Sequence, residues 1–226
     1  MGYRRVPFAE GEFYHCFNRG IDKRDTFASE HDCLRFIQLL YLANDESPIK
    51  RENFYHMKHA EILTIQRQAP IVSVVAYCLM KNHYHLLLHE IIEGGIIKFM
   101  QKVGTGYAMY FNEKYDRIGN LFIKPFRSKH IDSDEYLRRV VQYIHLNPAE
   151  LYEHEWKTGK VKNIARLEDE LIKYPFSSLP DYVGKKRDEL YILDARTMTP
   201  LRSNRLSLRS ILREAAEYYA DLEHEF

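Results

Sequence analysis

The sequence of 226 residues is poor in cysteine and in long apolar runs, and both shortages narrow what the protein can be. Its three cysteines, Cys16, Cys33 and Cys78, are isolated, so neither a zinc ribbon nor a disulfide framework is indicated. No stretch approaches the roughly 20 apolar residues that cross a membrane. The first residues lack the apolar core of a signal peptide. We therefore expect a reduced, cytoplasmic setting.

The chain also lacks an excess of charge, because its net charge is only +1. Any surface that binds DNA must then come from local clusters of cations. The candidates are Arg19, Lys23 and Arg24 in an early loop, and Lys124, Arg127 and Lys129 in the segment KPFRSK. That segment interleaves cations with an aromatic ring, which suits backbone contact and base stacking. A solvated loop explains these runs equally well, and it explains the run KKR at 185–187 better.

The most informative segment is an apolar run followed by histidines. Residues 72–80 read VSVVAYCLM, and residues 83–89 read HYHLLLH. Since side chains at i and i+2 of a strand share a face, His83 and His85 would project side by side. Two adjacent imidazoles in that register can hold one divalent metal ion. The pattern also arises by chance, and His89, of the same parity, is either a third imidazole or a solvated edge residue.

A second informative segment, SDEYLRRVVQYIHLNP, is predicted to form a helix that ends near Pro148. Ser133 or Asp132 can cap its start, and the acidic residues of the first turn suit the helix dipole. Proline disfavours helical geometry in the residue before it, so the helix should finish at Asn147. Tyr143 and Asn147 are four residues apart and share a face. Taken alone, they are explained as a half-buried aromatic and a helix-end cap.

Together, these segments resemble the REP-associated tyrosine transposases, which are single-tyrosine transposases of the HUH type. The histidine motif is residues 77–87 (YCLMKNHYHLL), and the tyrosine motif is residues 143–148 (YIHLNP). Further matches are residues 14–20 (YHCFNRG), 110–112 (YFN), 119–122 (GNLF), 126–128 (FRS) and 174–178 (YPFSS). Lys81 stands where the family pattern has proline. The resemblance covers about residues 10–184.

The resemblance implies a metal-dependent endonuclease and strand transferase that acts on single-stranded or hairpin-forming repeat DNA. Tyr143 would attack a backbone phosphate and form a 5′-phosphotyrosine, which keeps the bond energy for rejoining. His83, His85 and Asn147 would hold Mg²⁺ or Mn²⁺ against that phosphate. The alternative is a domesticated sequence- or structure-specific DNA-binding protein with little or no cleavage activity. A weaker reading is a structural metal site in an unrelated protein, with Tyr143 in the core.

The order of predicted elements is that of an α+β, ferredoxin-like fold, βαββαβ, with the helices on one face of the sheet. The predicted strands are residues 11–19, 71–80, 83–90 and 120–130, and the predicted helices begin near Ser29 and at 94. Residues 52–66 could form an additional helix.

We expect residues 1–184 to form the HUH transposase domain and residues 185–226 a C-terminal extension that is largely helical. Leucines and other apolar residues recur at helical spacing over 205–225. The sequence does not distinguish a self-sufficient monomer from a homodimer that exchanges its tyrosine helices.

Overall fold

The computed structural model describes residues 7–49, 54, 56–158, 160–203, 207 and 210–211. Within this part of the chain, four antiparallel strands form one sheet in the order β2-β3-β1-β4. The strands are β1 (Phe13–Arg19), β2 (Val72–Met80), β3 (His83–Glu90) and β4 (Arg127–Ile131). The predicted α+β fold with the histidine strand inside the sheet is therefore confirmed.

The fourth strand is shorter than the sequence predicted, since pairing starts at Arg127 rather than near residue 120. Pro125 has no backbone N–H to donate, so the ladder cannot continue through it. Before Pro125, the chain meets the end of β1 in an isolated bridge between Gly20 and Phe122, and the backbone N–H of Ile123 donates to the carbonyl of Arg19 at 3.0 Å.

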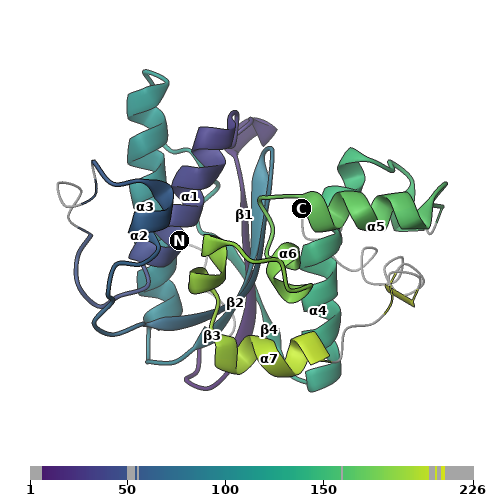
Figure 1. Cartoon of the computed structure of the whole chain (residues 1–226). Coiled ribbons are helices and arrows are strands. Elements are labelled where there is room, and N and C mark those ends of the chain that lie inside the picture. Colours follow the sequence, from purple (N-terminus) through teal and green to yellow (C-terminus); the bar gives the residue numbers. More distant parts are fainter. Residues whose placement is uncertain are drawn as a thin grey trace.

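One face of the sheet is covered by α1 (Glu30–Leu42), α2 (His59–Ile62) and α3 (Gly95–Lys114), as Figure 1 shows. Ser29 and Asp32 form a reciprocal capping box, so α1 begins close to Ser29, where the sequence predicted a helix start. The core on this face is aromatic, and the ring of Tyr84 packs 4.8 Å from that of Phe36, centroid to centroid. The helix expected over 52–66 is limited to the four residues of α2 among those described.

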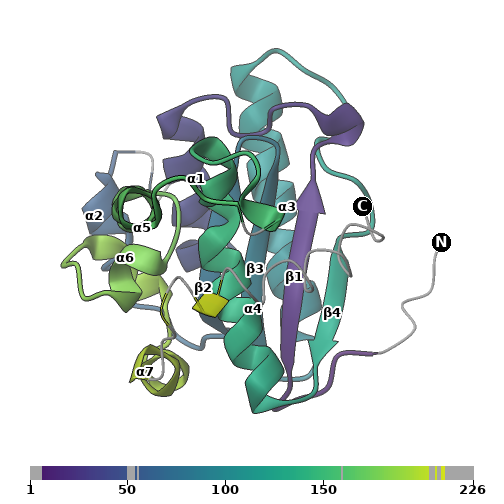
Figure 2. The same cartoon turned by 90° about the vertical axis from the view of Figure 1, so that its right-hand side faces the viewer.

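The opposite face carries α4 (Asp134–Leu146), which packs against β2 and β3 (Figure 2). Ser133 caps this helix, since its side chain accepts a hydrogen bond from the backbone N–H of Tyr136. The helix ends one residue before the predicted position, and the chain continues as a 3₁₀ turn, η3 (Asn147–Leu151). That turn tolerates Pro148 at its start, because a first-turn residue needs no N–H donor.

The described chain after α4 lies beside β2, the edge strand that pairs only with β3 within the sheet (Figure 2). Its elements are η4 (Trp156–Thr158), α5 (Ile164–Lys173), α6 (Leu179–Tyr182), η5 (Asp188–Ile192) and α7 (Ala195–Ser203). The backbone N–H of Leu79 donates to the carbonyl of Phe176 (2.9 Å), and that of Ser178 donates to Tyr77 (3.0 Å). These bonds occupy the strand edge, which would otherwise offer unpaired groups to another chain.

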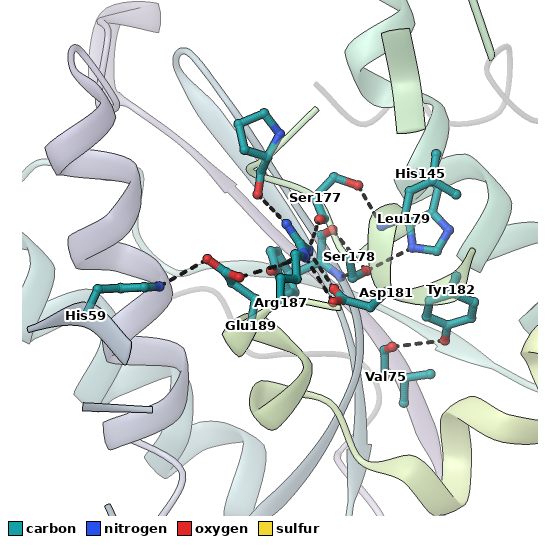
Figure 3. Close-up of polar contacts among 12 residues, drawn as sticks. His59, Val75, His145, Ser177, Ser178, Leu179, Asp181, Tyr182, Arg187 and Glu189 are labelled. Atoms are coloured by element: carbon teal, nitrogen blue, oxygen red, sulfur yellow. Dashed lines mark hydrogen bonds and ion pairs between the residues drawn. The ribbon is translucent and has the colours of Figure 1, made fainter. Parts of the chain in front are cut away.

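Figure 3 shows that a partly buried arginine, Arg187, joins several parts of the segment 174–192, which we call the edge segment. The Arg187 guanidinium donates to both carboxylate oxygens of Asp181 (2.9 and 2.5 Å) and to the carbonyl of Pro175 (2.8 Å). Beside it, Glu189 accepts from His59 at 3.1 Å. Arg187, a weak candidate for DNA binding from the sequence, is thus part of a structural ion network.

Residues 185–203 also contact the sheet directly, because the backbone N–H of Asp194 donates to Val74 (3.0 Å). The division of the chain at residue 184 stays a prediction, and the helix predicted over 205–225 lies almost wholly outside the described residues. The three cysteines are buried, and the described part of the chain contains no disulfide. No helix in that part is both long and apolar enough to cross a bilayer.

Candidate active site

His83 and His85 of β3 share one face of the sheet, as their spacing predicted, and this is the face that carries α4. Their ring centroids are 5.2 Å apart with the planes at 88°, while Tyr84 between them packs on the opposite face. In both rings Nδ1 takes part in a hydrogen bond. His83 Nδ1 lies 2.7 Å from Asn82 Oδ1, and His85 Nδ1 lies 2.9 Å from His15 Nε2. Because an amide oxygen only accepts, His83 carries its proton on Nδ1, and Nε2 is the nitrogen that can bind a metal.

Helix α4 brings Tyr143 against these histidines. The Tyr143 ring meets the His85 ring edge-on, with centroids 5.3 Å apart and planes at 89°. One turn later, the Asn147 side-chain N–H donates to the Tyr143 backbone carbonyl at 2.9 Å. With its nitrogen used in this way, the amide oxygen of Asn147 is the atom that can meet a ligand.

Both candidate ligand histidines are neutral at ordinary pH. Burial and the nearby Arg19 lower the pKa of His83 to about 4, although a hydrogen bond with Asn147 opposes this. Burial, with the neighbouring His15 and His83, holds the pKa of His85 well below its usual value. Metal ions bind the neutral imidazole, so no proton has to be removed from an imidazolium before a metal ion can bind.

The four side chains open into one pocket with a volume of about 570 Å³. Charged and polar side chains from three different segments also line it, and they are Arg19, Asp25, Lys81, Asn82, Glu150, His154 and Lys157. Lys81 pairs with Asp25 at 2.9 Å, and the Lys157 ammonium lies 4.0 Å from Glu150. The pocket therefore combines candidate metal ligands, a tyrosine and charged side chains of both signs.

The donor set fits a divalent ion with open coordination positions. Among the described residues, no group of three His, Cys, Asp or Glu side chains is arranged to hold a metal. Two imidazole nitrogens and an amide oxygen form a different set, one that suits Mn²⁺ and leaves positions for phosphate and water. The convergence of His83, His85 and Asn147 on one pocket meets that requirement.

Three of the six cations proposed for DNA binding lie on the histidine face. Arg19 lines the pocket and stands opposite His83 in the β1–β3 register. Arg127 and Lys129 of β4 stand opposite Phe17 and His15, and paired residues of neighbouring strands share a face. The Lys129 ammonium lies 5.6 Å from the ring centroid of Tyr136 on α4, which agrees with that placement.

The other three cations lie elsewhere. Arg24 bonds within its own loop, to the carbonyl of Ile21 (3.0 Å) and to Asp22 (3.5 Å). Lys23, in the turn η1 (Ile21–Lys23), is exposed beside the His83 end of the sheet, since Asn82 donates to its carbonyl. Lys124 lines a separate pocket next to α3.

The structure adds residues that the sequence did not single out. His15 of β1 is fully buried behind His85, and Lys157 reaches the pocket from η4. The strand alternation of residues 13–19 hinted at His15, but its partner depends on the strand register. His89, left open by the sequence, stacks on Phe13 with centroids 4.5 Å apart and does not line the pocket.

Comparison with known proteins supports the resemblance inferred from the motifs. Residues 44–147 match the family model described as "Transposase IS200 like". No curated protein matches the chain. Among solved structures, the chain is similar to one described as "Structure of the REP associates tyrosine transposase bound to a REP hairpin", at 16% identity and a TM-score of 0.50. The match covers 84% of this chain and 90% of that one, so the two share a fold. The predicted likeness to these transposases is confirmed.

Proposed function

We propose that this chain, whose residues 44–147 match the IS200-like transposases, is a metal-dependent endonuclease and strand transferase for single-stranded DNA. One observation supports the proposal most strongly. Tyr143 meets His85 edge-on in the same pocket that His83 and Asn147 line, although the residues come from different elements. A tyrosine that served only the core would not need two neutral imidazoles and the amide of Asn147 beside it in an open pocket.

In the proposed reaction, the Tyr143 hydroxyl oxygen attacks the phosphorus of a DNA phosphodiester. The new bond joins that oxygen to phosphorus, and the bond from phosphorus to the 3′ oxygen breaks. The phenol loses its proton, and the departing 3′ oxygen gains one, so a 3′-OH and a 5′-phosphotyrosine result. Attack by a 3′-OH on the phosphotyrosine reverses these changes and joins strands without ATP.

His83, His85 and Asn147 would hold Mg²⁺ or Mn²⁺, which when bound polarises a non-bridging phosphate oxygen and offsets developing negative charge. The protein orients the reacting groups. Packing of α4 against β3 holds the Tyr143 ring in place. The hydrogen bond from the Asn147 side chain to the Tyr143 backbone carbonyl fixes the orientation of the Asn147 amide. Such positioning lowers the entropic part of the barrier.

The substrate that best fits is a DNA hairpin with a single-stranded flank. The similar solved structure is described as bound to a REP hairpin. In this chain, Arg19 and Lys157 in the pocket lining, with Arg127 and Lys129 on the same sheet face, offer positive charge for a DNA backbone. The proposal assigns these four residues to phosphate contacts.

The test uses a hairpin oligonucleotide from repeats that flank the gene, labelled at either its 5′ or its 3′ end. The protein is incubated with Mn²⁺ or with EDTA, and the products are run on denaturing gels. We expect a slowly migrating adduct on the 3′-labelled strand, dependent on Mn²⁺ and lost in Tyr143→Phe. Tyr136→Phe, on the same helix, is the matched control and should retain it. DNA binding without any adduct would favour the domesticated DNA-binding protein.

A further inference from the structure

A third histidine lies directly behind the candidate metal ligands. His15 is fully buried on β1, and its Nε2 is 2.9 Å from Nδ1 of His85. In the β1–β3 register His15 stands opposite Leu87, so it reaches His85 along the diagonal of the sheet. Its ring also lies 5.6 Å from the ring of Tyr143, centroid to centroid. One side chain thus touches both a candidate metal ligand and the candidate nucleophile.

The contact allows two arrangements of protons. In the first, His85 carries its proton on Nδ1 and donates it to His15, which leaves the lone pair on His85 Nε2. In the second, His15 donates from Nε2, and His85 carries its proton on Nε2, where a metal ion would bind. Only the first arrangement leaves His85 able to act as a metal ligand.

The surroundings of His15 indicate that the contact with His85 is its main polar interaction. His15 Nδ1 is buried, and it finds no hydrogen-bond partner among the residues that the structure describes. A buried polar atom without a partner costs free energy, which an apolar residue at this position would avoid. The presence of a histidine here is therefore better explained by the hydrogen bond between its Nε2 and His85.

We propose that His15 is a positioning residue whose Nε2 accepts the Nδ1 proton of His85, and so presents the His85 Nε2 lone pair to the pocket. The inference rests on the proposed metal-dependent function, and it concerns the protein before any metal ion binds. A buried imidazole then takes the place of the carboxylate or carbonyl that commonly orients a metal-binding histidine.

The first test needs no metal. Nitrogen NMR of the imidazole rings in the metal-free protein distinguishes the two tautomers of each histidine. We expect a protonated Nδ1 and an unprotonated Nε2 for His85, and a protonated Nδ1 for His15. A proton on Nε2 of His85 would overturn the inference, whatever the protein does to DNA.

The second test measures Mn²⁺ affinity without DNA, by electron paramagnetic resonance. His15→Phe keeps a buried ring but removes the acceptor, and we expect it to weaken Mn²⁺ binding about 10- to 100-fold. His15→Gln restores an acceptor and should recover part of the affinity. His89→Phe, on the strand of His85 but outside the pocket, is the matched control and should bind like the unsubstituted protein.

Thermal unfolding of each variant shows whether the fold is intact. Equal losses of affinity in folded His15→Phe and His15→Gln would mean that His15 serves packing only, against the inference. Full affinity in His15→Phe would also overturn it. Failure of the unsubstituted protein to bind Mn²⁺ would contradict the proposed metal-dependent function instead, and the tautomer measurement would still decide the role of His15.

Discussion

The ring of Tyr143 on α4 lies edge-on to the ring of His85 on β3, with their centroids 5.3 Å apart. In the sequence, α3 and β4 separate the two elements. The contact between the two rings nevertheless forms within a single chain. This relationship places a hydroxyl-bearing ring beside the candidate metal ligands. The predictions that follow concern the affinity for Mn²⁺, the affinity for DNA and the stability of the fold around the site.

The oxygen of Asn147 is predicted to be a metal ligand, because its nitrogen already donates to the Tyr143 carbonyl. Asn147→Leu should therefore weaken Mn²⁺ binding at least tenfold, whereas Asn147→Asp should bind Mn²⁺ at least as tightly, since a carboxylate is a harder oxygen donor. Titration with Mn²⁺ in the absence of DNA measures both. Unchanged affinity in Asn147→Leu would remove Asn147 from the site.

Lys157, which lines the pocket, is predicted to contact a DNA phosphate there. Lys157→Ala should weaken DNA binding and reduce the slope of log affinity against log salt by about 0.7, the value for one phosphate on a single strand. Fluorescence anisotropy over a range of salt concentrations measures this slope. Lys162→Ala, an exposed lysine outside the pocket, is the control, and an equal effect of both substitutions would contradict the assignment.

Arg187 is predicted to hold the edge segment onto β2. Its removal leaves the fully buried carboxylate of Asp181 without its cation, and breaking a buried pair in this way costs about 3–5 kcal/mol. Arg187→Ala should lower the free energy of unfolding by that amount in urea titrations. Lys186→Ala, at an exposed neighbour, should change it by less than about 0.5 kcal/mol. A small effect of Arg187→Ala would show that the network does not stabilise the fold.

Asp32 is predicted to make stability depend on pH. Burial raises the pKa of its carboxyl group, but hydrogen bonds from Lys114, Tyr115, Tyr110 and Ser29 outweigh burial and hold the pKa at about 2. Because this value lies below the unfolded value of 3.8, the contribution is complete above pH 4 and is lost as the pH falls toward 2. The difference corresponds to about 2 kcal/mol.

Asp32→Asn should therefore be less stable than the unsubstituted protein at pH 7, and its stability should fall less between pH 4 and pH 2. Urea unfolding at several pH values measures both. Asp169→Asn is the control, since the Asp169 side chain is 60% exposed and its pairing with Lys173 contributes little. Parallel pH profiles for Asp32→Asn and the unsubstituted protein would contradict the account.

Much of the site could be predicted from local patterns. The alternation around His83 and His85 fixed which side chains share a face, because a strand has a period of two. The spacing of Tyr143 and Asn147 placed both on one face of a helix for the same kind of reason. These predictions depend only on residues near one another in the sequence.

Features that depend on distant pairing could not be predicted. His15 meets His85 only because β1 pairs with β3 in one particular register, and no local pattern specifies that register. The segment around Ser178 pairs with the edge of β2, a contact across about a hundred residues of chain that the motif YPFSS does not reveal. Lys157 lies in a short 3₁₀ turn without periodicity, so its position depends on how the turn packs.

The central claim is that Tyr143 becomes covalently joined to DNA. The most direct measurement is mass spectrometry of peptides from the protein after reaction with a hairpin oligonucleotide and Mn²⁺, followed by nuclease digestion of the DNA. The account predicts a nucleotide linked through its 5′ phosphate to the peptide that contains Tyr143, and no such peptide when EDTA replaces Mn²⁺. A linkage to Tyr136 or to any other residue, or a linkage that forms equally well in EDTA, would contradict it.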